Sequence, residues 1–258
     1  MERLKCLQDL LKSYQKVAIA YSGGCDSHFL YEVARQTLGN KNVLAVLCQG
    51  EMMSKEDIDD ARALLKDGQY VICDVDVFSI EAFHFNHRDR CYHCKKMIMS
   101  KVKEEAQKRD FHYILDGKNV DDEKVYRPGI KACQEVGIIS PLSLAGFTKQ
   151  MIRDYSKQFN IVTYNKPSNA CLASRFPYDT VLTKEKLALV SKAESLLHQR
   201  GIFHCRVRVH ENIARIEVDK HKFKSIIDDE LLVAEFEKLG FDFITLDLKG
   251  IMSGSYDK

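Results

Sequence analysis

The sequence lacks any apolar run that could cross a membrane, because no stretch approaches the roughly 20 apolar residues that a spanning helix needs. It also lacks an excess of charge: 39 Lys and Arg oppose 37 Asp and Glu, which leaves a net charge of +2 on 258 residues. We therefore expect neither a membrane nor a nucleic-acid partner. Any anion binding must come from local clusters of basic residues.

We also expect no secretory signal. The first sixteen residues, MERLKCLQDLLKSYQK, carry charges throughout and predict an amphipathic helix rather than a signal peptide. The nine cysteines are an odd number, and without a signal they argue against a disulfide framework. We expect a cytoplasmic protein with reduced thiols, among which Cys48, Cys73 and Cys133 act as small buried hydrophobes.

Strand and helix patterns alternate over the first two thirds of the chain. The strands are continuous apolar runs, so they predict a parallel sheet covered by helices on both faces, the doubly wound α/β class. The predicted strands are 16–21, 42–48, 70–75 and 112–117, and the predicted helices are 27–38, 54–65, 94–109 and 148–159.

A polar connection at 165–180 marks a change of pattern. The helix–strand–strand–helix–strand order that follows predicts a second, smaller α+β unit, whose first two strands form a hairpin. We therefore expect two domains, 1–170 and 175–258. Within the second, the first helix and the three strands are predicted at 183–200, 204–210, 213–218 and 242–248.

The stretch AYSGGCDSHFL (20–30) ends the first strand and opens the first helix. Gly23 and Gly24 allow close backbone approach, and the free N–H groups of a helix N-terminus face an anion. Ser22 and Ser27 add hydroxyl donors. A Gly-Lys-Ser/Thr ending is missing, so this is not a Walker loop.

Further polar residues follow the fourth strand. Asp116 and Gly117 lie at the carboxyl edge of the predicted sheet, with Asp121 and Asp122 just beyond. Open α/β sheets bind ligands at that edge, so these residues are candidates for holding a ligand. Asp-Gly is also a plain turn signal.

The stretch RCYHCKK carries two thiols, Cys91 and Cys94, among basic residues. Such a pair can bind a metal, form a reversible disulfide at a helix start, or have no special role. Cys171 is a candidate third ligand, because it lies in the polar connection rather than on an apolar face. Cys205 alternates with arginines on a strand, and we expect it in the core.

Arg206 and Arg208 alternate on one predicted strand and so share a face. Guanidinium groups suit phosphate and carboxylate, and Arg175 lies beside Cys171. Two acids, Glu194 and Glu217, are candidates for binding magnesium or orienting these arginines. The alternative is a set of cross-strand ion pairs on a solvated hairpin face.

The loop Ser22-Gly23-Gly24-Cys25-Asp26-Ser27 resembles the SGGxDS loop of the PP-loop ATP pyrophosphatase superfamily, whose fold is adenine nucleotide α-hydrolase-like. Beyond it, a series of motifs from about residue 16 to 255 is similar to the LarE-type ATP-dependent sulfur transferases. The motifs are RCYHCKK, DGKNVDDEKVYRPGIKA, SPL (140–142), KPSNACLASRFPY, CRVRVHENIARIEV, TLDLKG and SGS (253–255).

The resemblance implies an enzyme that uses ATP and Mg²⁺ to adenylylate a carboxylate of pyridinium biscarboxylate mononucleotide and convert it to a thiocarboxylate in nickel-pincer nucleotide cofactor biosynthesis. It implies that ATP is bound by loop residues together with two residues after the fourth strand: Ser22, Gly23, Gly24, Asp26, Ser27, Asp116 and Gly117. Anchors for the acidic nucleotide would be Arg206, Arg208, Glu194 and Glu217.

In this family the sulfur comes either from a single cysteine, which matches Cys171, or from a sulfide on a 4Fe–4S cluster held by three cysteines. Because Cys91 and Cys94 are present with Cys171, the chain resembles the cluster-bearing branch. The resemblance places Cys171, Ser174 and Arg175 in the catalytic group. The sulfur donor stays unknown, and we expect a homo-oligomer.

Three other interpretations use the same cysteines. A tRNA-thiolating PP-loop enzyme carries a similar three-cysteine cluster but requires a broad basic surface. A structural zinc site would need a fourth ligand. A Cys-x-x-Cys redox protein would need no ATP.

Overall fold

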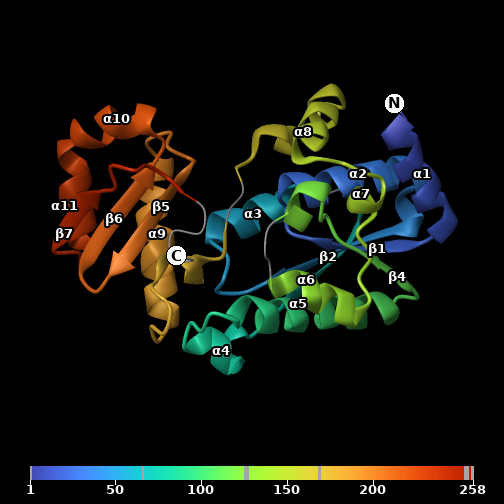
Figure 1. Ribbon diagram of the computed structural model, residues 1–258, viewed down its shortest axis with the longest axis horizontal. Helices are drawn as coiled ribbons and strands as arrows, with labels where there is room; N and C mark the ends of the chain where they lie inside the picture. Colours follow the sequence, from blue (N-terminus) through green and yellow to red (C-terminus); the bar gives the residue numbers. More distant parts are fainter. Residues whose placement is uncertain (1, 66, 125–127, 168–169, 253–255, 257–258) are drawn as a thin grey trace. The chain divides into compact units, whose positions relative to one another are not determined.

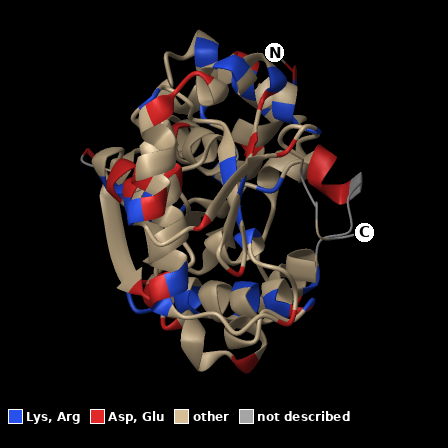
Figure 2. Ribbon diagram, turned by 90° about the vertical axis from the view of Figure 1, so that its left-hand side faces the viewer, with Lys and Arg blue, Asp and Glu red and all other residues tan. Residues whose placement is uncertain are grey.

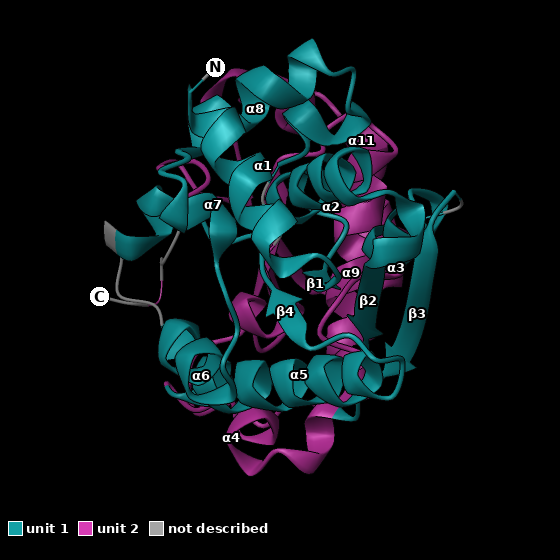
Figure 3. Ribbon diagram, turned by 90° about the vertical axis from the view of Figure 1, so that its right-hand side faces the viewer, with its two compact units in different colours: residues 1–50, 57–76, 89–169 teal, residues 51–56, 77–88, 170–258 magenta. Residues whose placement is uncertain are grey.

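The computed structural model describes residues 2–65, 67–124, 128–167, 170–252 and 256. The chain divides into two compact units. The N-terminal unit comprises 1–50, 57–76 and 89–169, and the C-terminal unit comprises 51–56, 77–88 and 170–258. Two short segments from within the first half of the chain therefore belong to the second unit (Figure 3).

The N-terminal unit is built on a four-stranded, wholly parallel sheet in the order β3-β2-β1-β4. Its strands are β1 (Val17–Tyr21), β2 (Val43–Gln49), β3 (Gln69–Asp74) and β4 (Tyr113–Leu115). The central strand β1 is almost wholly buried, as its apolar sequence predicts. The expected doubly wound α/β class is confirmed.

Helices cover both faces of this sheet (Figures 1 and 3). One face carries α1 (Glu2–Tyr14), α2 (Cys25–Leu38), α7 (Pro141–Leu144) and α8 (Lys149–Gln158). The other carries α5 (Arg90–Gln107) and α6 (Pro128–Val136). A further helix, α3 (Lys55–Ala63), follows β2 in the chain.

The C-terminal unit is the small α+β arrangement that the element order predicts. Its sheet has the order β5-β6-β7, with β5 (Cys205–His210) antiparallel to β6 (Ile213–Val218) and β6 parallel to β7 (Phe243–Leu246). The predicted hairpin is confirmed, since His210 pairs with Ile213 across a two-residue turn. The helices are α4 (Glu81–His84), α9 (Lys184–His198), α10 (Phe223–Ile227) and α11 (Glu230–Lys238).

Most predicted boundaries hold within about two residues, and threonine side chains explain two of them. Thr148 and Thr183 accept hydrogen bonds from the N–H groups of Met151 and Lys186, and so cap α8 and α9. One start was wrong: the helix expected at 94 begins at Arg90, so both paired cysteines lie inside it. Within the described ranges, no helix combines the length and apolarity that crossing a membrane requires.

Candidate functional site

The glycine-rich loop leads from β1 into α2 and leaves the helix start without a side-chain cap. The first intrahelical bond runs from the His28 N–H to the Gly24 carbonyl, at 3.0 Å. The N–H groups of the three residues between them therefore have no acceptor inside the helix. These donors, with the positive end of the helix dipole, form a site for an anion.

Two serines shape the loop. The hydroxyls of Ser22 and Ser27 lie 3.0 Å apart, and the Ser27 oxygen also accepts from the Ser22 N–H at 3.3 Å. Ser27 is buried, whereas Ser22 is exposed. The buried serine thus holds the loop, and the exposed one is accessible to a ligand.

Two glycines permit close packing around the loop. Gly23 has φ +71, and a Cβ there would lie 2.5 Å from the Cβ of Ala61. Gly117, just beyond β4, lies so close to the start of α2 that a Cβ would come within 2.8 Å of the Ser27 N. Gly117 therefore does lie against the loop, although 90 positions separate it from Ser27.

The neighbouring acids have local partners. Asp116 is buried and accepts from the Lys118 N–H at 3.2 Å, which is the turn contact that Asp-Gly predicts. Asp122 accepts from the Asn119 N–H at 3.1 Å. The turn and the predicted ligand-binding edge thus use the same residues.

Asp26, in the first turn of α2, pairs with a residue that the sequence did not single out. Its Oδ1 lies 2.7 Å from the Nζ of Lys149, the first residue of α8. Burial raises the pKa of the Asp26 carboxyl, although Lys149 and Arg153 act in the opposite direction. The sequence predicted a helix at 148–159, but no local pattern indicated this ion pair.

The paired cysteines lie three residues apart at the start of α5, with Cys91 exposed and Cys94 buried. Of the flanking basic residues, Lys96 is bound to Glu135 at 2.7 Å and to the Tyr92 hydroxyl at 3.2 Å. Cys171, the candidate third ligand, belongs to the C-terminal unit. Among the described residues, no three His, Cys, Asp or Glu side chains form a group that could hold a metal ion.

Four further thiols behave as core residues. Cys48, Cys73 and Cys133 are buried, as predicted, and so is Cys205. Burial raises the pKa of the Cys48 thiol to about 12 and that of Cys133 to about 11, so both stay protonated at neutral pH.

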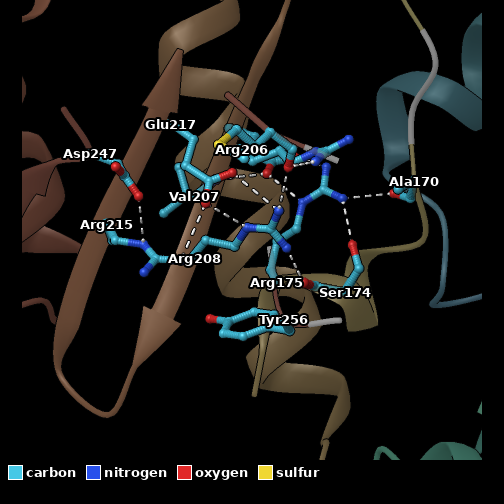
Figure 4. Close-up of polar contacts among 12 residues, drawn as sticks. Ala170, Ser174, Arg175, Arg206, Val207, Arg208, Arg215, Glu217, Asp247 and Tyr256 are labelled. Atoms are coloured by element: carbon cyan, nitrogen blue, oxygen red, sulfur yellow. Dashed lines mark hydrogen bonds and ion pairs between the residues drawn. The ribbon is translucent and has the colours of Figure 1, made fainter. Parts of the chain in front are cut away.

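In the C-terminal unit, Arg175 ends a short 3₁₀ turn that begins just after Cys171 (Figure 4). Its guanidinium binds both carboxylate oxygens of Glu194, at 2.7 and 2.9 Å. It also donates to the carbonyl of Cys171 at 3.5 Å. Although burial acts against it, the carboxylate of Glu194 raises the pKa of Arg175, with smaller effects from the nearby thiols of Cys171 and Cys205.

A second buried pair lies on the hairpin. Arg208 binds both oxygens of Glu217 at 3.1 Å each, and it also donates to the carbonyl of Ser174. Arg175 donates to the Ser174 hydroxyl at 3.0 Å (Figure 4). Ser174 thus joins the segment that carries Cys171 to the arginine strand. The alternative of cross-strand ion pairs on a solvated face is confirmed for the pair Arg208–Glu217 but was wrong about solvation, because these side chains are 2% and 1% exposed.

Arg206 differs from Arg175 and Arg208 in its hydrogen-bond partner. It pairs in strand register with Glu217, but that carboxylate binds Arg208 and Arg215 instead. Within the part of the chain that the structure describes, its hydrogen bond goes to a neutral acceptor, the carbonyl of Met252, at 2.6 Å. Burial, with Arg208 and Arg175 nearby, lowers the pKa of Arg206. An added anion would therefore be stabilised at Arg206.

Both glutamates proposed as ligand anchors are thus engaged by arginines. Glu194 accepts from Arg175 and from the Val207 N–H at 2.9 Å, and Glu217 accepts from Arg208 and Arg215. Their geometry favours the orienting role over magnesium binding. The predicted motif at 253–255 and parts of two others, 125–127 and 168–169, lie outside the described residues.

Comparison with known proteins adds relatives along nearly the whole chain. A pyridinium-3,5-bisthiocarboxylic acid mononucleotide synthase from Lactiplantibacillus plantarum is 36% identical over 95% of this chain and 90% of its own length. The chain belongs to this LarE family. An uncharacterised Synechocystis protein is 33% identical over 99% of this chain and 97% of its own length. An uncharacterised protein from Methanocaldococcus jannaschii is 28% identical over 91% of this chain and 90% of its own length.

A family model described as NAD synthase matches residues 2–112, which contain the glycine-rich loop and the first three strands. The LarE resemblance stated from sequence motifs is confirmed, and with it a PP-loop type of N-terminal unit. By family, the chain is an enzyme.

Proposed function

We propose that this LarE-family chain is an ATP-dependent sulfur transferase that converts a carboxylate of pyridinium-3,5-biscarboxylic acid mononucleotide to a thiocarboxylate. The observation that carries the proposal is the 36% identity, over 95% of the chain, to an enzyme named as the synthase of the bisthiocarboxylic product. The uncapped start of α2 after a glycine-rich loop supports ATP as the activating substrate.

In the first step, a substrate carboxylate oxygen attacks the α-phosphorus of ATP. The α–β phosphoanhydride bond breaks, pyrophosphate leaves, and an acyl-adenylate forms. The free N–H groups of Cys25, Asp26 and Ser27, with the Ser22 hydroxyl, hold the departing pyrophosphate. Gly117 lets the end of β4 approach this loop, and Asp116 adds a carboxylate for a magnesium ion that accompanies ATP.

In the second step, a sulfur nucleophile attacks the acyl carbon, and the bond to AMP breaks. If the sulfur is that of Cys171, a thioester forms; breaking the Cys171 Cβ–S bond, with loss of the α-proton, then releases the thiocarboxylate and leaves dehydroalanine. Arg175, whose Nη1 lies 3.5 Å from the Cys171 carbonyl, stabilises a thiolate at this position.

A 4Fe–4S cluster is the alternative source. Thiolates are the usual ligands of such a group, and Cys91 and Cys94 lie three residues apart on one helix. The described residues themselves hold no group of three metal ligands. With Cys171, this pair would hold the cluster, which supplies a sulfide for transfer when bound. We propose this cluster-bearing form, with the donor that restores the sulfide unidentified.

The substrate is an acidic nucleotide, and the arginines of the C-terminal unit suit it. Arg206 is the buried cation bound to a neutral carbonyl, so it takes the phosphate or the second carboxylate. Glu194 and Glu217 orient Arg175 and Arg208 around it. We propose that residues 1–170 bind ATP, that 175–258 bind this substrate, and that the enzyme works as a homo-oligomer.

The test is anaerobic incubation of the purified chain with ATP, Mg²⁺ and the biscarboxylate mononucleotide. We expect pyrophosphate release that depends on the mononucleotide, and a product whose mass shows exchange of oxygen for sulfur. Omitting ATP should abolish both. Pyrophosphate release without any sulfur in the product would contradict sulfur transfer while leaving adenylylation intact.

The tRNA-thiolating interpretation predicts a broad basic surface. In Figure 2, acidic and basic residues lie interspersed along the same elements, in keeping with the net charge of +2. Replacing the mononucleotide with bulk tRNA in the same assay tests it directly. Bound zinc in the anaerobic protein, in place of iron, would favour the structural metal site.

A further inference from the structure

The glycine-rich loop contains no lysine, yet a lysine from another element reaches it. The Nζ of Lys149 lies 2.7 Å from Asp26 Oδ1, and 123 positions separate the two residues. Both belong to the N-terminal unit. A positive charge is therefore held beside the uncapped N–H groups at the start of α2.

The start of α8 is fixed so that this side chain emerges at the loop. The Lys149 N–H donates to Asp121 Oδ2 at 2.9 Å, and Thr148 caps the helix from the preceding position. The Lys149 side chain is 31% exposed and that of Asp26 is 24% exposed. The ammonium group is thus positioned but still accessible to a ligand.

The ion pair is not what docks α8. Tyr155 of α8 packs against Phe29 of α2 with ring centroids 6.4 Å apart, and both rings also contact Phe147. Partly exposed ion pairs contribute about 1 kcal/mol or less to stability. Removing the Lys149 charge should therefore leave the fold in place.

We propose that Lys149 is the phosphate-binding cation of this loop and contacts the β- and γ-phosphates of ATP, the part that leaves as pyrophosphate. This inference rests on the proposed use of ATP. Asp26 holds the ammonium in position until the nucleotide arrives, and the more strongly charged phosphates then take it over. Lys149 supplies the point charge that a Walker lysine provides from within its own loop.

The experiment measures the affinity of Mg²⁺-ATP, AMP and inorganic pyrophosphate for the full chain by calorimetry. The variant is Lys149→Met, and the control is Lys157→Met, which removes the same charge from the exposed last turn of the same helix. We expect Lys149→Met to weaken the binding of ATP and of pyrophosphate by about tenfold to a hundredfold, the range for a charge-assisted hydrogen bond. AMP should bind equally, and Lys157→Met should bind all three as the wild-type chain does.

Thermal unfolding of both variants separates binding from folding, and Lys149→Arg, which keeps the charge, should restore most of the ATP affinity. Equal loss of AMP and ATP affinity in Lys149→Met would overturn the assignment, as would undiminished ATP binding. If the wild-type chain binds pyrophosphate but not ATP, the proposed function fails while the pyrophosphate result still decides the role of Lys149. If it binds neither, both fail.

Discussion

Arg208 and Glu217 form a two-pronged ion pair within the β5–β6 hairpin, with both N–O distances at 3.1 Å and both side chains almost fully buried. The same guanidinium reaches the carbonyl of Ser174, three residues after Cys171. Packing of the hairpin and placement of the cysteine segment thus depend on one buried charge pair.

Glu217→Gln should destabilise the chain strongly, because it leaves Arg208 buried without a compensating charge. We expect the free energy of unfolding to fall by about 3–5 kcal/mol in urea titrations. The control, Glu237→Gln on the exposed face of α11, should change it by less than about 0.5 kcal/mol. A loss of similar size in both variants would show that the buried Arg208–Glu217 pair contributes no more to stability than an exposed glutamate does.

Two of the glycines with positive φ, Gly23 and Gly39, allow backbone strain to be separated from close packing. Gly39→Ala meets no atom within 4 Å at φ +79 and ψ 153, so only the backbone cost of about 1–3 kcal/mol applies. Gly23→Ala, at φ +71, must also displace Ala61 and should lose clearly more stability and, in addition, ATP affinity. Thermal unfolding and calorimetry check this. Equal effects of the two substitutions would mean that the approach to Ala61 does not matter.

Cysteine variants distinguish the two sulfur sources. If a cluster donates the sulfur, both Cys91→Ser and Cys171→Ser should lose iron and product formation, and we expect this result. Cys6→Ser, on the exposed side of α1, is the control and should keep both. Iron content, acid-labile sulfide and thiocarboxylate yield are the measurements. Product formation that survives Cys91→Ser but not Cys171→Ser would show that Cys171 is consumed.

Stability should depend on pH through His28. Burial, with smaller effects from Arg35 and Lys166, lowers the pKa of His28 to about 4 in the folded chain. In the unfolded chain the pKa of His28 is near 6.5, so the unfolded state binds this proton more readily. The stability that neutral His28 contributes is therefore fully present above pH 6.5 and is lost as the pH falls toward 4.

The loss assigned to His28 is on the order of 3 kcal/mol between pH 7 and pH 4. The variant His28→Gln should lack that part of the acid sensitivity, measured as unfolding free energy against pH. His221→Gln, at an exposed position, serves as the control and should follow the wild-type curve. Identical curves for the wild-type chain and His28→Gln would rule out this residue as a source of acid sensitivity.

Local patterns in the sequence determined the order of the elements. Apolar runs predicted the parallel strands, and the alternation in CRVRVH predicted that Arg206 and Arg208 share a face. The glycine-rich loop and the LarE motifs were likewise visible without coordinates. These features depend on neighbouring residues, or on periods of two and 3.6, which a sequence displays directly.

Only the tertiary structure decided which charges meet. Nothing near Asp26 in the sequence indicates Lys149, and nothing near Arg175 indicates that Glu194 binds it. Glu217 lies opposite Arg206 in register yet binds Arg208, and Arg206 donates to the carbonyl of Met252. Such choices follow from how packed elements bring distant side chains together and bury them, because burial makes an unpaired charge costly and so selects the partner.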